Sequence, residues 1–242
     1  MPDVKALKKL LASRPERADR RQFLAEGANA VSSALDAGVV LELFTTDPAS
    51  YPDATVITQR QLEQLTDART PQPVVALCRF VDVPFASVAS PRLVAICADV
   101  RDPGNAGTVI RCADAAGADA VVLAGDSVDA YNPKTVRASV GSLFHLPVVV
   151  ERDAASAVRA AQDAGLVVLA ADGAGERDLF EIDGLLEQPT AWLFGNEAWG
   201  LPPDLADLAD HRVGIPIHGR AESLNLATAA ALCLYASARV QQ

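Results

Sequence analysis

The sequence predicts an α/β protein built on a mostly parallel sheet. Short runs rich in β-branched residues alternate with alanine-rich stretches of helical length along the 242 residues, and this alternation is typical of sheets covered by helices. Several runs, such as those at 92–100 and 120–125, are almost entirely apolar, as strands buried on both faces are. The length allows one large domain or two smaller ones.

The first third of the chain is predicted to form a small unit of its own. Residues 23–38 carry apolar side chains at helical spacing and end at Gly38, which predicts a helix closed by glycine. The predicted elements that follow are strands at 39–46, 54–58 and 73–80, with a helix at 59–68. Residues 82–91 contain prolines and have no clear period, so we expect a linker there and a domain boundary near residue 85.

The second part reads as a series of strand–helix–strand units. Its six predicted strands lie at 92–100, 120–125, 146–151, 166–172, 190–195 and 211–217. The predicted helices lie at 108–118, 134–144, 154–165 and from 225 onward, and 101–107 is expected to be a polar turn. Because such sheets bind ligands beyond the carboxyl ends of their strands, the residues that follow each strand are the candidates for a site.

The charge and the cysteine content limit the classes of partner that we expect for this chain. The net charge of −10 counts against a protein held on nucleic acid by bulk electrostatics. The N-terminal stretch is locally basic, however, and forms either a solvated helix face or a phosphate-contacting strip; its cations are Lys5, Lys8, Lys9, Arg14, Arg17, Arg20 and Arg21. Four scattered cysteines without a CxxC pair predict reduced thiols, a cytoplasmic protein and no metal site.

Targeting to or across a membrane is not expected. The chain has no uninterrupted apolar run of about 18 residues, the length that a membrane-spanning helix requires, so no membrane partner is predicted. Its first residues carry charges throughout and lack the apolar core of a secretory signal.

Three strand ends in the second part carry unusual polar residues. Asn105 follows the first of these strands, and Arg111 comes six residues later; Glu197 lies in "LFGNEAWGLP", and Ser223 and Asn225 precede the final helix. Neither a G-x-G-x-x-G fingerprint nor a P-loop is present. Because the three ends belong to one predicted sheet, we expect these side chains to converge.

Each of these residues also has an ordinary structural interpretation. Asn105 could be a turn residue, Arg111 a surface arginine and Glu197 a loop carboxylate. Ser223 could be the N-cap of the last helix. For the aromatic residues Tyr131 and Trp199, stacking on a nucleobase competes with core packing, and core packing is favoured for Trp199.

Four segments in order resemble a known family. "DVRDPGNAGTVIRCADAAGADAVVL", "YNPKTVRASVGSLFHLPV", "LFGNEAWGLP" and "IPIHGRAESLNLATAAALCLY" resemble the conserved motifs of the SpoU (TrmH-like) RNA ribose 2′-O-methyltransferases of the SPOUT superfamily. The resemblance covers residues 92–240. Residues 20–80 resemble the L30e-like substrate-binding domain that precedes the catalytic domain in many members.

The resemblance implies a particular architecture and cofactor. It divides the chain into an L30e-like RNA substrate-binding domain at 1–85 and a SPOUT methyltransferase domain at 86–242, whose parallel sheet ends in a C-terminal trefoil knot. Two subunits pair to complete the active site, so a homodimer is expected. The knot loops would hold S-adenosylmethionine; the implied cofactor residues are Ala170, Ala171, Gly195, Ile215 and Leu224.

The resemblance also implies catalytic roles. Asn105 would anchor the target ribose, and Arg111 would either activate the hydroxyl or hold a substrate phosphate close to it. Glu197 would stay ionised and orient neighbouring loops, while Ser223 and Asn225 would complete the polar pocket. The proton acceptor stays open. Methyl transfer from a sulfonium needs neither a metal nor a covalent enzyme intermediate, because the sulfonium is already a strong electrophile. Alignment of the hydroxyl with the methyl carbon can supply ~7–11 kcal/mol of barrier reduction.

The function implied is transfer of a methyl group from S-adenosylmethionine to a ribose 2′-hydroxyl of structured RNA. By the resemblance, the front domain favours ribosomal RNA, 23S in particular, because the tRNA-specific members usually lack it and use helical extensions instead. Its L30e-like type also suits recognition of an RNA bend or loop by shape. Two alternatives stay open. One is a tRNA guanosine 2′-O-methyltransferase, and the other is a non-catalytic RNA-binding protein that retains the fold.

Overall fold

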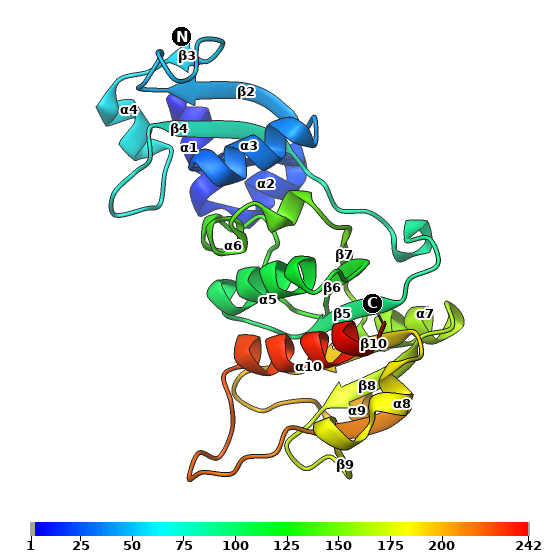
Figure 1. The fold of residues 1–242 in the computed structure, drawn as a ribbon. Helices are drawn as coiled ribbons and strands as arrows, with labels where there is room; N and C mark the ends of the chain where they lie inside the picture. The colour runs from blue at the N-terminus through cyan, green and yellow to red at the C-terminus, as the bar shows by residue number, and fades with distance from the viewer. Residues whose placement is uncertain (1–2, 242) are drawn as a thin grey trace.

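Two sheets organise the described residues, 3–241, of the computed structural model, and the two units stack end to end (Figure 1). The first sheet has the order β1-β4-β2-β3, with β1 at Gln22–Glu26, β2 at Val40–Thr45, β3 at Thr55–Val56 and β4 at Val74–Arg79. β1 and β2 run antiparallel to β4, and β3 runs parallel to β2. The helices of this unit are α1 (Val4–Ala12), α2 (Arg14–Arg20), α3 (Ala28–Asp36) and α4 (Gln59–Gln64).

The prediction of a helix from residue 23 is wrong for its first part. Residues 22–26 form strand β1, and only 28–36 are helical. Gly27, at φ +93°, turns the chain from strand into helix. The run of Phe23, Leu24 and Ala25 is buried in full against β4 and the elements on either side of the sheet. The apolar spacing of this segment fits either a helix or a strand, and its pairing with β4 makes it a strand.

The second sheet has seven strands in the order β7-β6-β5-β10-β8-β11-β9, and every pair is parallel. The six predicted strands are confirmed: β5 (Leu93–Ala98), β6 (Ala120–Ala124), β7 (Val148–Glu151), β8 (Val167–Ala171), β10 (Thr190–Phe194) and β11 (His211–Gly214). The seventh, β9, is only Arg177–Asp178, too short to show any period in the sequence. The trefoil knot that the resemblance implies stays a prediction.

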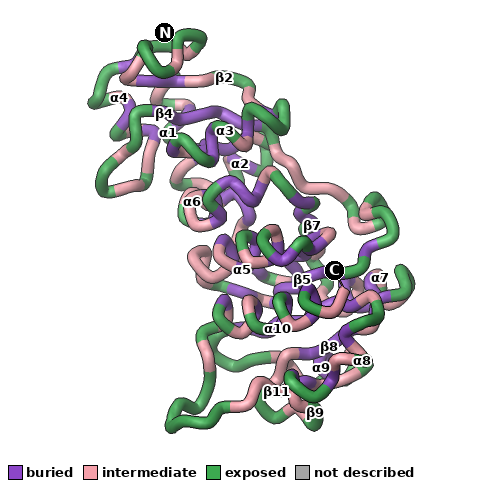
Figure 2. Tube along the Cα trace, viewed as in Figure 1, coloured by how far each residue is buried: buried purple, intermediate pink, exposed green. Residues whose placement is uncertain are grey.

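Helices cover both faces of this sheet. They are α5 (Pro103–Ala115), α6 (Pro133–Ser139), α7 (Ala154–Asp163), α8 (Asp183–Leu186), α9 (Pro203–Ala206) and α10 (Leu226–Gln241), with short 3₁₀ turns at Phe85–Ser87, Ser142–Phe144 and Leu179–Glu181. Alternate residues of β5 face opposite sides: Ala95 packs in the cluster of α5 and α10, and Ile96 packs in the cluster of α7. The central strands β5, β6 and β10 are accordingly buried along their whole length, whereas β7, β9 and β11 toward the sheet edges are only partly buried (Figure 2).

Two helix boundaries differ from the prediction for local reasons. α5 begins at Pro103 rather than at 108, because the Asp102 side chain caps it by accepting from the backbone N–H of Asn105 at 2.8 Å. α6 ends at Ser139 rather than continuing to 144, since Val140 and Gly141 both have positive φ.

The junction between the two units is held by a buried ion pair and an aromatic cluster. The buried Arg17 donates from Nε to Asp129 at 2.8 Å and from Nη1 to the carbonyl of Leu10 at 2.5 Å. The ring of Tyr131 stacks on Phe80 at a centroid distance of 3.7 Å. Tyr131 is fully buried, so core packing, and not stacking on a nucleobase, is its role.

The basic N-terminal segment is largely occupied by protein contacts. Arg17 is buried, Arg20 pairs with Glu16 at 3.2 Å, and Arg21 pairs with Asp82 at 3.0 Å. These contacts favour the helix-face interpretation over a free phosphate-contacting strip.

Within the described residues, no helix combines the length and apolar character needed to cross a membrane.

Gly107 sets how closely α5 approaches α6. A Cβ at this position would lie 2.4 Å from the carbonyl oxygen of Thr135 and 2.7 Å from Cβ of Ala138. We expect Gly107→Ala to lower the free energy of unfolding by about 1–3 kcal/mol, because the backbone must shift to admit the methyl group. Gly184→Ala is the matched control, since nothing lies within 4 Å of its Cβ. Equal stability of the two variants in denaturant unfolding would contradict this contact.

Candidate active site

A cavity of about 530 Å³ opens beyond the carboxyl ends of β8, β10 and β11. Its volume lies in the range of small-molecule sites. Its walls come from the chain segments that follow these three strands and from the start of α10: the lining residues are Ala171, Asp172, Gly173, Phe194, Gly195, Asn196, Glu197, Ala198, Gly200, Val213, Ile215, Ile217, Glu222, Ser223, Leu224, Asn225, Leu226 and Ala229.

Most of the predicted site residues take part in this cavity. Seven of the ten line it, namely Ala171, Gly195, Glu197, Ile215, Ser223, Leu224 and Asn225. An eighth, Asn105, contacts two of the lining side chains. Ala170 and Arg111 lie elsewhere. Ala170 is fully buried among the residues under α7, and Arg111 is exposed on α5.

At the mouth of the cavity, three polar side chains from distant segments form a cluster. Asn105, in the first turn of α5, donates from Nδ2 to Glu197 at 3.1 Å. Its Oδ1 accepts from Nδ2 of Asn225, also at 3.1 Å. An amide nitrogen has two hydrogens and an amide oxygen two lone pairs. The two contacts therefore fix the orientation of Asn105 and leave one donor and one acceptor site for a ligand.

Glu197 is ionised in this setting. Burial would raise the pKa of this carboxyl, but hydrogen bonds from backbone N–H groups and from the Asn105 amide outweigh burial, so its pKa lies below the ordinary value. Two of those donors are the backbone N–H groups of Arg101 and Asp102, at 3.1 and 3.0 Å. The carboxylate thus ties the loop after β10 to the start of α5.

The loop at 195–200 is closed by hydrogen bonds within it and to a neighbouring loop. Asn196 and Gly200 exchange two backbone hydrogen bonds, each of 2.9 Å. The buried side chain of Asn196 donates to the carbonyl of Asp99 at 2.7 Å and accepts from the N–H of Ala198 at 2.8 Å. A Cβ at Gly195 would lie 2.4 Å from the backbone of Gly200, so only glycine fits there.

Asn196 is a residue that the sequence reasoning missed. The available signal was an asparagine between a glycine and a carboxylate directly after a strand, which is a pattern typical of side-chain-capped turns. The sequence reasoning also missed Asp172 and Glu222, which add carboxylates to the cavity wall.

Asn225 both caps the last helix and joins the cluster. Its Oδ1 accepts from the backbone N–H groups of Ala227 and Thr228 at 2.9 and 3.3 Å, while its Nδ2 donates to Asn105. The cap of α10 is therefore Asn225, and the interpretation of Ser223 as that cap is wrong. Ser223 is exposed and lines the cavity.

The residues present fit S-adenosylmethionine. Gly195 lines the cavity, and because it has no Cβ the backbone of Gly200 can close against it and shape the wall. Ile215, Leu224 and the other aliphatic lining residues offer an apolar surface for an adenine ring. Glu222 and Asp172 supply negative charge for a cationic ligand.

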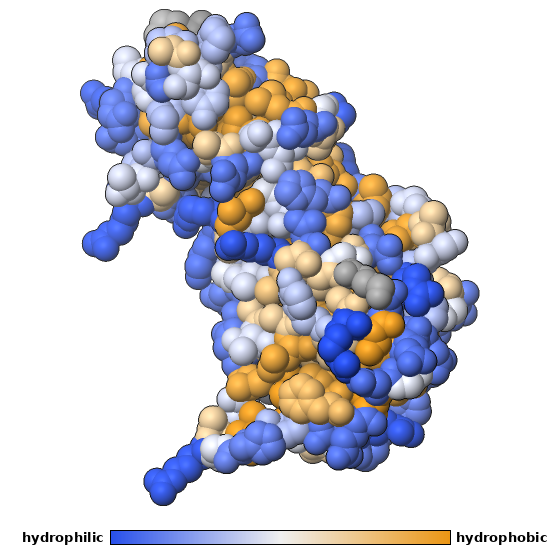
Figure 3. Space-filling model, in the orientation of Figure 1, coloured by the Kyte–Doolittle hydropathy of each residue, from blue (hydrophilic) through white to orange (hydrophobic). Residues whose placement is uncertain are grey.

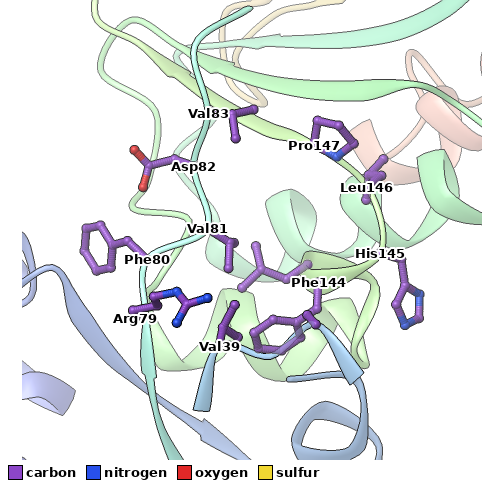
Figure 4. Close-up of a pocket in the computed structure, with 12 residues that line it drawn as sticks. Val39, Arg79, Phe80, Val81, Asp82, Val83, Phe144, His145, Leu146 and Pro147 are labelled. Atoms are coloured by element: carbon purple, nitrogen blue, oxygen red, sulfur yellow. The ribbon is translucent and has the colours of Figure 1, made fainter. Parts of the chain in front are cut away.

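A second cavity, of about 410 Å³, lies at the junction of the two units (Figure 4). Val39, Phe80, Val81 and Phe144 form much of its apolar wall, and Arg79 is among its polar residues. It lies at the amino end of β7, and none of the predicted site residues lines it.

The low pKa of Glu197 gives a testable dependence on pH. A carboxyl with a depressed pKa in the folded state stabilises the fold above its ordinary pKa range, and this contribution is lost as the pH falls through the folded-state pKa. We expect Glu197→Gln to reduce stability at neutral pH and to reduce the loss of stability on acidification, measured by denaturant unfolding. Glu63→Gln, at an exposed position on α4, is the control. Identical pH profiles for wild type and Glu197→Gln would contradict this account.

The carboxyl edge of this parallel sheet holds a small-molecule cavity and, beside it, the Asn105 amide in a fixed orientation. This arrangement is expected of a group-transfer enzyme that binds a cofactor and a second substrate. The comparisons with known proteins narrow this class. Residues 92–235 match the model of the SpoU rRNA methylase family, and residues 1–76 match the MRM3-like substrate-binding domain. The chain belongs to the SpoU rRNA methylase family.

Curated relatives match nearly the whole chain. The 23S rRNA (guanosine(2553)-2′-O)-methyltransferase RlmP of Bacillus subtilis (strain 168) is 36% identical and is aligned over 94% of this chain and 92% of its own length. The 23S rRNA (uridine(2479)-2′-O)-methyltransferase of Streptomyces viridochromogenes is 34% identical over 95% of this chain and 87% of its own.

Solved structures agree with the fold of both units. The AdoMet-bound rRNA methyltransferase from Sinorhizobium meliloti has a TM-score of 0.87 at 34% identity, with 98% of this chain and 94% of that chain covered. The SpoU methyltransferase AviRb from Streptomyces viridochromogenes in complex with AdoMet has a TM-score of 0.86 at 32% identity, with 99% and 97% covered. The predicted family and fold are confirmed.

Proposed function

We propose that this chain transfers a methyl group from S-adenosylmethionine to a ribose 2′-hydroxyl of 23S rRNA. The observation that carries the proposal is the fixed Asn105–Glu197–Asn225 cluster at the mouth of a cavity that fits this cofactor. Two relatives of at least 34% identity over nearly the full chain, each named as a 23S rRNA 2′-O-methyltransferase, support the substrate.

When bound, S-adenosylmethionine supplies an electrophilic methyl group. Gly195, Ala171, Ile215 and Leu224 hold it in the cavity through backbone approach and apolar contact. Asn105 uses its remaining donor and acceptor to place the target ribose. Because Glu197 and Asn225 fix this amide before substrate arrives, the alignment needs no reorganisation at the moment of transfer.

Glu197 orients and does not take the proton. Its carboxylate already accepts three hydrogen bonds, and its depressed pKa makes it a weak base. Arg111 is exposed on α5 and does not line the cavity of its own subunit. Its role is therefore to act on substrate bound by a second copy or to hold a phosphate outside the cavity, with the guanidinium protonated in either case.

The homodimer is part of this proposal. α10 exposes Leu232 and Tyr235 beside α5, and hydrophobic side chains gather over the lower part of this face (Figure 3). Pairing two copies through this surface would bury it and bring Arg111 of one copy toward the site of the other. Sedimentation of the full chain tests the pairing.

The domain roles and the location complete the proposal. Residues 1–85 recognise the RNA and residues 86–242 carry the methyltransferase site, with Ser223 completing its polar wall. A cytoplasmic location is supported by the four cysteines, all of which are free.

Methyl transfer from labelled S-adenosylmethionine to purified RNA tests the function. We expect incorporation into 23S rRNA, with 2′-O-methylation at one nucleotide, and none into 16S rRNA or tRNA. Incorporation into tRNA alone would favour the tRNA guanosine 2′-O-methyltransferase. Cofactor binding without transfer to any of these RNAs would favour the non-catalytic RNA-binding protein.

A further inference from the structure

The two tryptophans of the chain lie in opposite environments. Trp192, in β10, is fully buried, and its indole N–H donates to Ser237 at 2.9 Å. Trp199 is 62% exposed, although the sequence reasoning favoured core packing for it. That expectation is wrong. Single exposed apolar residues are common on protein surfaces, so it is the place of this side chain in the fold that points to a role.

Trp199 lies on the loop that forms part of the cavity wall. Its neighbours Ala198 and Gly200 both line the cavity wall, whereas the Trp199 side chain does not. Glu197, two residues earlier, holds the Asn105 amide. The exposed indole is thus carried by a loop that forms part of the cavity wall, two residues along the chain from the carboxylate that holds Asn105.

Hydrogen bonds fix the backbone of the loop around Trp199, and the indole itself stays exposed. Asn196 and Gly200 close the loop on either side of Trp199 with two backbone hydrogen bonds, and the Asn196 side chain anchors the loop to Asp99 and to the N–H of Ala198. Little conformational freedom of the backbone would be lost if a ligand stacked on this ring, which is the pre-organisation that favours binding.

We propose that Trp199 stacks on a nucleobase of the RNA whose ribose hydroxyl lies at Asn105. This inference rests on the proposed function. The base of a nucleotide is attached to the ribose carbon next to the one that bears the 2′-hydroxyl, so a ribose docked at Asn105 brings its own base, or that of its neighbour, to the rim of the cavity. Aromatic side chains are the usual platforms for unstacked RNA bases.

We expect stacking on Trp199 to add affinity for RNA whichever base is stacked. Every base has a π-face, so stacking adds affinity without requiring a particular base. Trp199 would accordingly act on the binding of RNA, and not on the binding of S-adenosylmethionine or on the transfer step.

Steady-state kinetics with a 23S rRNA fragment test the proposal. We expect Trp199→Ala to raise KM for the RNA by about 5- to 150-fold, the loss of one stacked base, with kcat at saturating RNA and cofactor affinity unchanged. Trp199→Phe keeps an aromatic face and should recover most of the affinity. Phe180→Ala is the matched control: Phe180 is 61% exposed in the same sheet domain but does not line the cavity, and its removal should leave KM unchanged.

Fluorescence provides a readout that a merely structural role would not change. Because Trp192 is buried, quenching on addition of the RNA fragment should come from Trp199 and should disappear in Trp199→Phe. An unchanged KM in Trp199→Ala, or quenching that persists in Trp199→Phe, would overturn the proposal. Conversion of a wild-type dimer to a monomer by Trp199→Ala would also overturn it, since Trp199 would then contact a second copy. Absence of transfer by the wild type would instead contradict the proposed function.

Discussion

Asn105→Ala is expected to lower kcat by about 100- to 1000-fold while cofactor and RNA affinities stay close to those of the wild type. A loss of this size follows the removal of one pre-organised polar group from a site where it acts on the reacting centre. Asn105 is held by Glu197 and Asn225 at 3.1 Å each, so its orientation is set before the RNA binds. Single-turnover methyl transfer, with both affinities measured separately, gives the comparison.

Asn132→Ala is the control for this prediction. Asn132 also lies at the start of a helix, where its side chain accepts from the N–H of Lys134 at 2.9 Å, but it does not line the cavity. Its replacement should cost about 0.5–2 kcal/mol of stability as a lost cap and leave kcat unchanged. Equal kcat values for Asn105→Ala and the wild type would remove Asn105 from the reaction.

Arg17→Met is expected to lower the free energy of unfolding by about 3–5 kcal/mol. Removing one partner of a buried ion pair leaves an uncompensated charge, here Asp129, at the junction of the two units. Arg17 also donates to the carbonyls of Leu10 and Leu11, which would lose these partners. Denaturant unfolding at neutral pH measures the effect.

Arg20→Met gives the matched comparison on the same helix. Arg20 pairs with Glu16 at 3.2 Å in a partly exposed position, where an ion pair contributes about 0–1 kcal/mol. The double variant Arg17→Met, Asp129→Leu should recover part of the loss, because no buried charge is left unpaired. Similar losses for Arg17→Met and Arg20→Met would show that the junction does not depend on the buried pair.

The strands of the second sheet and the meeting of the polar residues at its edge could be predicted, because both follow from the order of short segments along the chain. A parallel sheet brings its carboxyl ends to one edge, so polar residues at 105, 197 and 225 meet once the strands are correctly identified. The start of α5 was also accessible, since Asp102 followed by Pro103 is a helix-start signal that the prediction did not use.

Other features depend on contacts between distant segments and leave no local signal. Residues 22–26 fit a helix or a strand by spacing, and pairing with β4 decides between them. The burial of Arg17 depends on Asp129, over a hundred residues away in the chain. Trp199 is exposed on a loop that closes through backbone hydrogen bonds between Asn196 and Gly200, and the residue type alone does not reveal this exposure.

Calorimetric titration of the full chain with S-adenosylmethionine tests the central claim that three distant segments form one cofactor cavity. The wild type is predicted to show saturable binding at a single class of site, and Gly195→Val is predicted to abolish it, because a side chain there would collide with the backbone of Gly200. The Gly184→Ala variant should bind as the wild type does. No binding by the wild type, or undiminished binding by Gly195→Val, would contradict this cavity as the cofactor site.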